Sequence, residues 1–144
     1  MNREIHEDTM AAVRLRLALV RLSRALRQGN TAGLSASQLS ALATIDEYGP
    51  LRLSALAERE SVGAPVATRV VASLEELGLV ARSEDPLDKR ASLVRLSQEG
   101  QETIDAIWNQ RTLGLSSRLD VLSEAERTAI EAALPALERM AREL

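Results

Sequence analysis

Hydrophobic residues recur with a helical period at both ends of this chain. Within residues 8–27 an apolar stripe repeats every three or four positions between arginines, which predicts an amphipathic helix. Further apolar residues widen this stripe into a face that we expect to be buried against more than one neighbour. The stripe consists of Leu15, Leu19, Leu22 and Leu26, and the residues that widen it are Val13, Leu17 and Val20.

A second long stripe lies at the other end of the chain. Ser97 can cap a helix over about residues 98–119, and the capping box at residues 123–126 opens a final helix. Pro135 inside that helix removes one backbone hydrogen bond and predicts a kink near Glu131. The apolar spacing of four, three, four and three residues is typical of a helix that packs along a partner. The residues are Ile130, Leu134, Leu137, Ala141 and Leu144.

The middle of the chain carries shorter helical signals. Residues 35–38 (SASQ) form a capping box that opens a helix to about residue 47, and Tyr48-Gly49-Pro50 ends it. Residues 53–59 predict a short helix, and residues 60–63 form a turn that contains a glycine. The order of these elements is that of a helix-turn-helix.

The helix after this turn has two different faces. Pro65 fits only its first turn, and Gly78 stands where a C-cap glycine belongs. The exposed face offers small residues, a hydroxyl at Thr68 and, on its flank, Arg69. The Thr68 methyl group could meet a thymine methyl group, and Arg69 a guanine or a phosphate. An ordinary amphipathic helix with a solvated face fits the pattern equally well. The apolar stripe consists of Val66, Val70, Leu74 and Leu77, opposite Pro65, Thr68 and Ala72.

A hairpin follows this helix. Residues 79–83 and 92–96 are short and apolar-rich, as strands are, and the Asp and Pro residues of 84–91 favour a protruding loop. Asp88 and Arg90 could pair at its tip and hold the guanidinium in one orientation. The alternative is a solvated loop whose charges protect the hairpin edge from aggregation. A helix followed by a basic hairpin fits duplex DNA, because the helix can enter a major groove while the tip reaches phosphates or the next groove.

These segments resemble the winged helix-turn-helix of the MarR (multiple antibiotic resistance regulator) family of transcription factors. The resemblance rests on Thr68-Arg69, Leu74 to Val80 (LEELGLV), Asp88-Lys89-Arg90 and Val94 to Gly100 (VRLSQEG). It implies a mainly α fold with a small two-stranded β-wing. The implied organisation is a single domain over 1–144, with a winged helix-turn-helix DNA-binding lobe at 34–97 and a helical dimerisation region at 1–30 and 98–144.

The resemblance also implies a sequence-specific transcriptional regulator, a repressor, that binds a pseudo-palindromic operator in double-stranded DNA as a homodimer. Two recognition helices would then enter successive major grooves roughly 34–36 Å apart. The corresponding DNA-binding residues are Ser61, Ala64, Pro65, Thr68, Arg69, Lys89 and Arg90, with Asp88 orienting the wing arginine. The expected dimerisation residues are Leu15, Ile130, Leu134, Leu137, Ala141 and Leu144. Packing of the last helix on the first helix of the same chain is the alternative.

A small ligand, often aromatic or phenolic, is a further implication of the resemblance. It would bind between the dimer helices and the DNA-binding lobes and change the spacing of the recognition helices. Tyr48 and Trp108 are the chain's aromatic residues, so one protomer cannot build a stacked aromatic box. Trp108 could line a pocket, although a tryptophan on a helix is more often part of the core.

Composition excludes several classes of function. No run of 18 apolar residues and no signal-peptide pattern is found, so we expect a cytoplasmic protein. The absence of cysteine and the single histidine, His6, argue against thiolate chemistry and a histidine-rich metal site. We therefore expect no metal and no cofactor. Since no phosphate-binding loop or nucleophile motif is present either, we expect no enzymatic activity.

Charge is distributed unevenly. Residues 1–30 hold six arginines against three acidic residues, residues 96–144 hold five against nine, and residues 52–95 hold seven charges of each sign. The DNA-binding lobe is thus not basic overall, and its basic groups must be aimed at the DNA. This neutral lobe keeps open an alternative function, a helical dimeric interaction protein without specific DNA binding.

Overall fold

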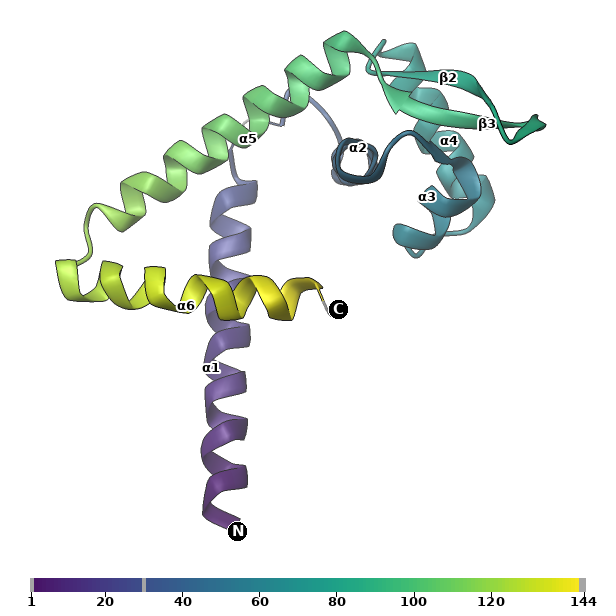
Figure 1. The fold of residues 1–144 in the computed structure, drawn as a ribbon. Coiled ribbons are helices and arrows are strands. Elements are labelled where there is room, and N and C mark those ends of the chain that lie inside the picture. Colours follow the sequence, from purple (N-terminus) through teal and green to yellow (C-terminus); the bar gives the residue numbers. More distant parts are fainter. Residues whose placement is uncertain (1, 30, 143–144) are drawn as a thin grey trace.

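The computed structural model describes residues 2–29 and 31–142 of the chain (Figure 1). These residues form a mostly helical fold with one small antiparallel sheet. None of the described helices is both long and apolar enough to cross a membrane. The elements are α1 (Asn2–Arg27), α2 (Ala36–Tyr48), β1 (Leu51–Arg52), α3 (Leu53–Arg59), α4 (Ala64–Glu76), β2 (Val80–Asp85), β3 (Asp88–Leu96), α5 (Gln98–Leu119) and α6 (Glu124–Arg142).

Serine caps set the start of three helices as predicted. The Ser35 side chain accepts the Gln38 amide at 3.2 Å while Gln38 accepts the Ser35 amide at 2.9 Å, which completes the capping box of α2. Ser97 accepts the Gly100 amide at 2.9 Å at the start of α5. Ser123 accepts the Glu126 amide at 3.3 Å before α6. α1 instead begins at Asn2, earlier than the predicted residue 8.

The sheet has three strands in the order β1-β3-β2, where the sequence predicted two. β1 pairs with β3 through Leu51 opposite Val94 and Arg52 opposite Leu93. A strand of two residues is too short to show an alternating pattern, which explains why the sequence did not reveal it.

The hairpin also differs from its prediction. β2 and β3 extend until only Pro86 and Leu87 separate them, so the expected eight-residue loop is a tight turn. Asp88, Lys89 and Arg90 consequently begin β3. Near the turn the two strands carry polar residues, of which Glu84, Lys89 and Arg90 are exposed, so this part of the hairpin resembles a loop in the sequence.

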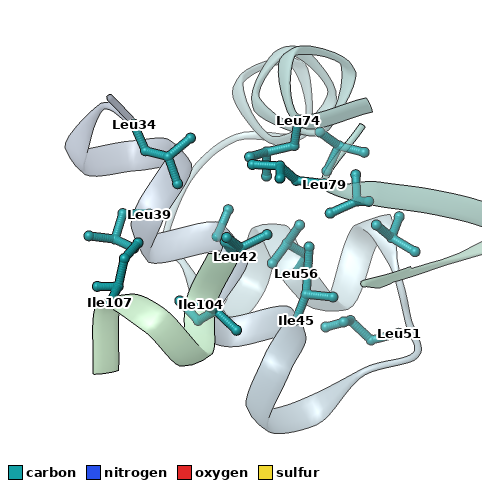
Figure 2. Packing of buried hydrophobic residues seen from close by; sticks show 14 residues of the cluster. Leu34, Leu39, Leu42, Ile45, Leu51, Leu56, Leu74, Leu79, Ile104 and Ile107 are labelled. Atoms are coloured by element: carbon teal, nitrogen blue, oxygen red, sulfur yellow. The ribbon is translucent and has the colours of Figure 1, made fainter. Parts of the chain in front are cut away.

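The hydrophobic core lies among α2, α3, α4, the base of the hairpin and the first turns of α5. Figure 2 shows Leu42, Ile45, Leu56 and Ile104 converging at its centre, where each is at most 2% exposed. Figure 1 shows these elements gathered at one end of α5, with α6 at the other end. α5 therefore connects the helix-turn-helix lobe with the rest of the molecule.

Helix α4 buries a stripe that matches the predicted one at Leu74 and partly at Val70, but not at its two ends. Ala67, Val71 and Leu74 face the core, whereas Val66 is 42% exposed and Leu77 is 49% exposed. Both stripes have helical spacing, so the sequence pattern alone favoured the larger side chains. α4 packs on α2 and α3, and the small side chain of Ala67 is buried at 3% exposed.

Helices α1 and α6 leave most of their apolar residues uncovered. α6 has no buried residue over its described length, and Leu19, Val20 and Leu22 of α1 are 44–49% exposed. One chain thus leaves the broad apolar face of α1 largely uncovered, and its burial against more than one neighbour stays a prediction. Leu144 lies outside the described residues. α6 runs through Pro135 as one helix, and the kink near Glu131 stays a prediction.

Candidate nucleic-acid interface

The N-terminal half of α4 presents a small, exposed surface. Gly63 is its N-cap residue, Ala64 and Pro65 begin the helix, and Thr68 and Arg69 follow on the exposed side. The Thr68 hydroxyl donates to the Ala64 carbonyl at 2.8 Å. Its hydrogen is thus used within the helix, so Thr68 can offer a partner its methyl group and an acceptor oxygen.

Ser61 lies in the turn just before α4. Its φ angle of 53° is left-handed, a conformation that is uncommon for residues other than glycine. The turn is held by the Ser61 amide, which donates to the Glu58 carbonyl, and by the Val62 amide, which donates to the Ala57 carbonyl, both at 3.0 Å. The turn thus carries Ser61 next to the exposed start of α4.

The wing, which we define as residues 80–96, carries the second group of predicted residues. The Arg90 Nε donates to Asp88 Oδ1 at 3.4 Å, so the ion pair expected between them is present. The Arg90 side chain is 93% exposed, and such a pair contributes little to stability. Asp88 also accepts the Arg90 backbone amide at 3.1 Å, and Lys89 is exposed beside them.

Polar contacts fix α4 against its neighbours. Gln38 Nε2 of α2 donates to the Ser73 hydroxyl at 3.1 Å, and Arg82 Nε of β2 donates to Glu75 Oε1 at 2.9 Å. The sequence identified Gln38 only as part of a capping box and Glu75 only as a member of the LEELGLV segment. Both residues help to set where α4 stands, but their partners are distant in sequence and no local pattern reveals them.

Three ion pairs join charged residues of the lobe. Asp85, Glu75 and Asp88 are paired with Arg52, Arg82 and Arg90, respectively. In the part of the chain that the structure describes, neither Arg69 nor Lys89 has an ion-pair partner. Arg69 on α4 and Lys89 on the wing, where the sequence predicts DNA contacts, thus keep their positive charges free of an acidic partner among the described residues.

An open hollow lies between α1 and α5, away from α4. Its volume is about 650 Å³, and a second hollow of about 310 Å³ beside the start of α2 shares three of its lining residues, Arg27, Trp108 and Arg111. Trp108 packs against the core and also lines both hollows, so the two predicted roles are combined. Tyr48 lies elsewhere, under the guanidinium of Arg59 at 3.7 Å.

Two contacts surround the Trp108 ring. Its Nε1 donates to Asp46 Oδ2 of α2 at 3.4 Å, and the Arg111 guanidinium lies 5.0 Å from the ring centre. The Nε of Arg111 is shielded from solvent and has no hydrogen-bond partner within the described residues. The hollow therefore combines apolar walls with the positively charged guanidinium of Arg111, which favours an anionic partner.

Comparison with known proteins agrees with this geometry. The MarR family model matches residues 34–92. An uncharacterised HTH-type transcriptional regulator of Mycobacterium bovis is 42% identical over 130 residues, which cover 90% of this chain and 91% of that protein. A MarR family protein of Bacillus stearothermophilus is 26% identical, with a TM-score of 0.78 over 94% of this chain and 97% of its own.

A third similar structure is that of Bordetella bronchiseptica BpsR, whose DNA binding is regulated by 6-hydroxynicotinic acid. BpsR is 25% identical, with a TM-score of 0.60 over 90% of this chain and 98% of its own. The order of the elements, the wing and the relatives lead to the same assignment. The chain belongs to the MarR family of winged helix-turn-helix transcriptional regulators.

Proposed function

We propose that this regulator is a cytoplasmic homodimer that represses transcription by binding a pseudo-palindromic operator. Residues 34–97 bind the DNA, and residues 1–30 and 98–144 form the dimer. The observation that carries this proposal is the exposed start of α4 beside the wing, where the exposed Arg69 and Lys89 have no ion-pair partner among the described residues.

The uncovered faces of α1 and α6 support the homodimer. The apolar stripe of α6, which we call the seam, contains Ile130 and Leu134. These residues are 38% and 44% exposed, so packing within one chain leaves the seam uncovered. A second copy can bury it together with Leu15, Leu137 and Ala141. The six arginines of residues 1–30 also complement the acidic excess of residues 96–144, which favours contact between these segments across a dimer.

The roles in DNA binding follow from the position of each side chain. At the start of α4, Pro65 and the Thr68 methyl group contact bases, Arg69 binds guanine or phosphate, and Ser61 and Ala64 allow close approach. On the wing, Lys89 binds phosphate and Arg90, held by Asp88, reaches the flanking backbone or the minor groove. Two such lobes related by twofold symmetry require an inverted repeat.

A small aromatic acid is the ligand class that best fits the hollow around Trp108. Leu19, Leu22 and Leu26 supply an apolar wall, and Arg111 supplies a guanidinium with an unused donor. The regulation of the similar BpsR by an aromatic acid is consistent with this assignment. Since the hollow lies between α5 and α1 and adjoins α2, a ligand there can change the angle between the lobe and the dimer helices.

Selection from a random pool of DNA duplexes tests the proposal. The wild-type protein, Arg90→Ala and a control variant, Arg118→Ala on α5, are compared at low and moderate salt. We expect the wild type and Arg118→Ala to enrich the same inverted repeat, and Arg90→Ala to enrich it weakly or not at all. Binding that disappears with salt and enriches no sequence indicates phosphate attraction alone and supports the interaction-protein alternative.

A further inference from the structure

Asp85, at the end of β2, is the one charged residue that is buried in the described part of the chain, at 4% exposed. Both of its carboxylate oxygens are bonded. Oδ2 lies 2.6 Å from both Nε and Nη2 of Arg52, and Oδ1 accepts the Leu87 amide at 2.8 Å. Asp85 therefore links the turn at the wing tip to a side chain on another strand.

The partner of Asp85 comes from the far side of the sheet. Arg52 lies on β1, and β3 separates β1 from β2. Leu93 of β3 is opposite both Arg52 and Ser83, so the Arg52 side chain crosses β3 and reaches two residues further along β2. Arg52 is also the N-cap residue of α3. One guanidinium thus connects the start of the helix-turn-helix with the tip of the wing.

Few other contacts hold this tip in place. Val80 and Val94 are buried at the base of the hairpin, whereas Leu87 at the turn is 92% exposed. The strand register also shifts between Glu84 and Asp85. A two-stranded ribbon is only marginally stable by itself, so apolar packing does not fix the direction of the tip. Figure 1 shows the hairpin extending away from the helices.

We propose that Arg52 and Asp85 are positioning residues for DNA binding. Their ion pair holds the wing tip at a fixed place relative to α3 and α4, so that Lys89 and Arg90 meet the DNA without first being ordered. This inference rests on the proposed role of the wing in DNA contact.

The charge state of Asp85 is consistent with this role. The Leu87 backbone amide and the Arg52 guanidinium hold the pKa of the Asp85 carboxyl below its ordinary value. The carboxylate is therefore ionised at neutral pH, where DNA binding is measured, and the ion pair is complete.

The direction in which Asp85→Asn changes the affinity for DNA distinguishes a positioning role from simple electrostatics. Asp85→Asn removes a negative charge near a DNA-binding surface, so electrostatics alone predicts tighter binding. If Arg52 itself binds phosphate, tighter binding is again expected, because Asp85→Asn frees the Arg52 guanidinium from its ion pair. Positioning predicts the opposite result, a loss of affinity of about three- to tenfold from the disordered wing. Glu84→Gln is the matched control, since it removes the same charge from the exposed neighbouring residue.

The experiment measures the affinity of each full-length variant for a duplex selected by the wild type. We expect Asp85→Asn, Arg52→Gln and the double variant to lose similar affinity, and Glu84→Gln to lose none. Arg90→Ala should cost less affinity in the Asp85→Asn background than in the wild type, whereas Arg69→Ala should cost the same in both. A purely structural role would not produce this difference. Thermal unfolding checks that each variant is folded. If Asp85→Asn does not fold, Arg52→Gln tests the same ion pair at a half-exposed residue.

Three outcomes would overturn the inference. Asp85→Asn could bind as tightly as Glu84→Gln, or Arg90→Ala could have the same effect in both backgrounds. In either case the wing still contacts DNA, and only the positioning role is wrong. If Arg90→Ala has no effect even in the wild type, the proposed contact between wing and DNA fails, and the positioning role fails with it.

Discussion

The helix-turn-helix lobe and the helices α1 and α6 differ sharply in how they are stabilised. The lobe has its own core, in which Leu42, Val71 and Leu74 are completely buried. α6 has no buried residue over its described length, although its apolar residues repeat as regularly as those of any helix in the chain. The difference shows that periodicity identifies a face that must be covered but does not identify what covers it. One chain completes the lobe, and we propose that a second copy completes the other region.

The largest effect is expected from a charge placed in the seam of α6. We expect Ile130→Asp to convert the dimer to monomers and to weaken operator binding by about 10²–10⁴-fold, because the second half-site is no longer bound by a linked lobe. Sedimentation and titration of a labelled operator measure the two effects. Val121→Asp is the control, since Val121 is 83% exposed and lies outside the seam. Equal behaviour of the two variants would contradict the assignment of the seam.

Two substitutions in α4 test whether the lobe has a core of its own. Leu74 is fully buried and Leu77 is 49% exposed, although both belong to the apolar stripe that the sequence favoured. Leu74→Ala should lower the free energy of unfolding by about 2–5 kcal/mol, and Leu77→Ala by far less. Chemical denaturation at one fixed protein concentration measures both values. Comparable losses of unfolding free energy would mean that the stripe predicted from the sequence, rather than the observed one, faces the core.

Substitutions in the lobe should impair DNA binding without changing the dimer. Arg69→Ala should weaken operator binding by about 1–3 kcal/mol and relax specificity at one base pair, while the protein remains a dimer. Binding to a series of operators with single base-pair changes measures the specificity. A uniform loss over the whole series would mean that Arg69 contacts phosphate alone.

Lys89→Ala should have a smaller effect of a different kind. A phosphate contact carries no sequence information, so all duplexes should be bound more weakly to the same degree. The slope of log affinity against log salt should fall by about one. An unchanged slope would exclude Lys89 as a phosphate contact.

The smallest expected effect concerns the stability of the wing in acid. The Leu87 amide and the Arg52 guanidinium hold the pKa of Asp85 below its ordinary value of about 3.9. The stabilisation is complete above the unfolded-state pKa and is lost as the pH falls through the lower folded-state pKa. The wild type should therefore lose stability more steeply than Asp85→Asn below about pH 4. Parallel curves of unfolding free energy against pH would contradict this.

The sequence predicted the parts of the fold that depend on local chemistry. Ser35, Ser97 and Ser123 begin helices because a nearby hydroxyl satisfies the free amides, and Gly78 follows α4 with a φ of 73°, as a C-cap glycine should. The ion pair between Asp88 and Arg90 was also predicted, since its members are two residues apart.

The features that the sequence missed depend on distant residues. Gln38 and Ser73 are 35 residues apart, and Arg52 and Asp85 are 33 apart, so no local pattern reveals their contacts. β1 exists only because β3 offers it a partner. The buried stripe of α4 depended on Ala67, whose small side chain gives no strong hydrophobic signal.

The central claim is that two copies of this chain, joined through α1 and α6, bind one operator through α4 and the wing. Sedimentation of the wild-type protein with a selected operator, and with the same duplex after one half-site has been scrambled, tests this claim most directly. We expect two chains on each intact duplex and a large loss of affinity on the scrambled one. One chain per duplex, with equal affinity for both, would contradict it.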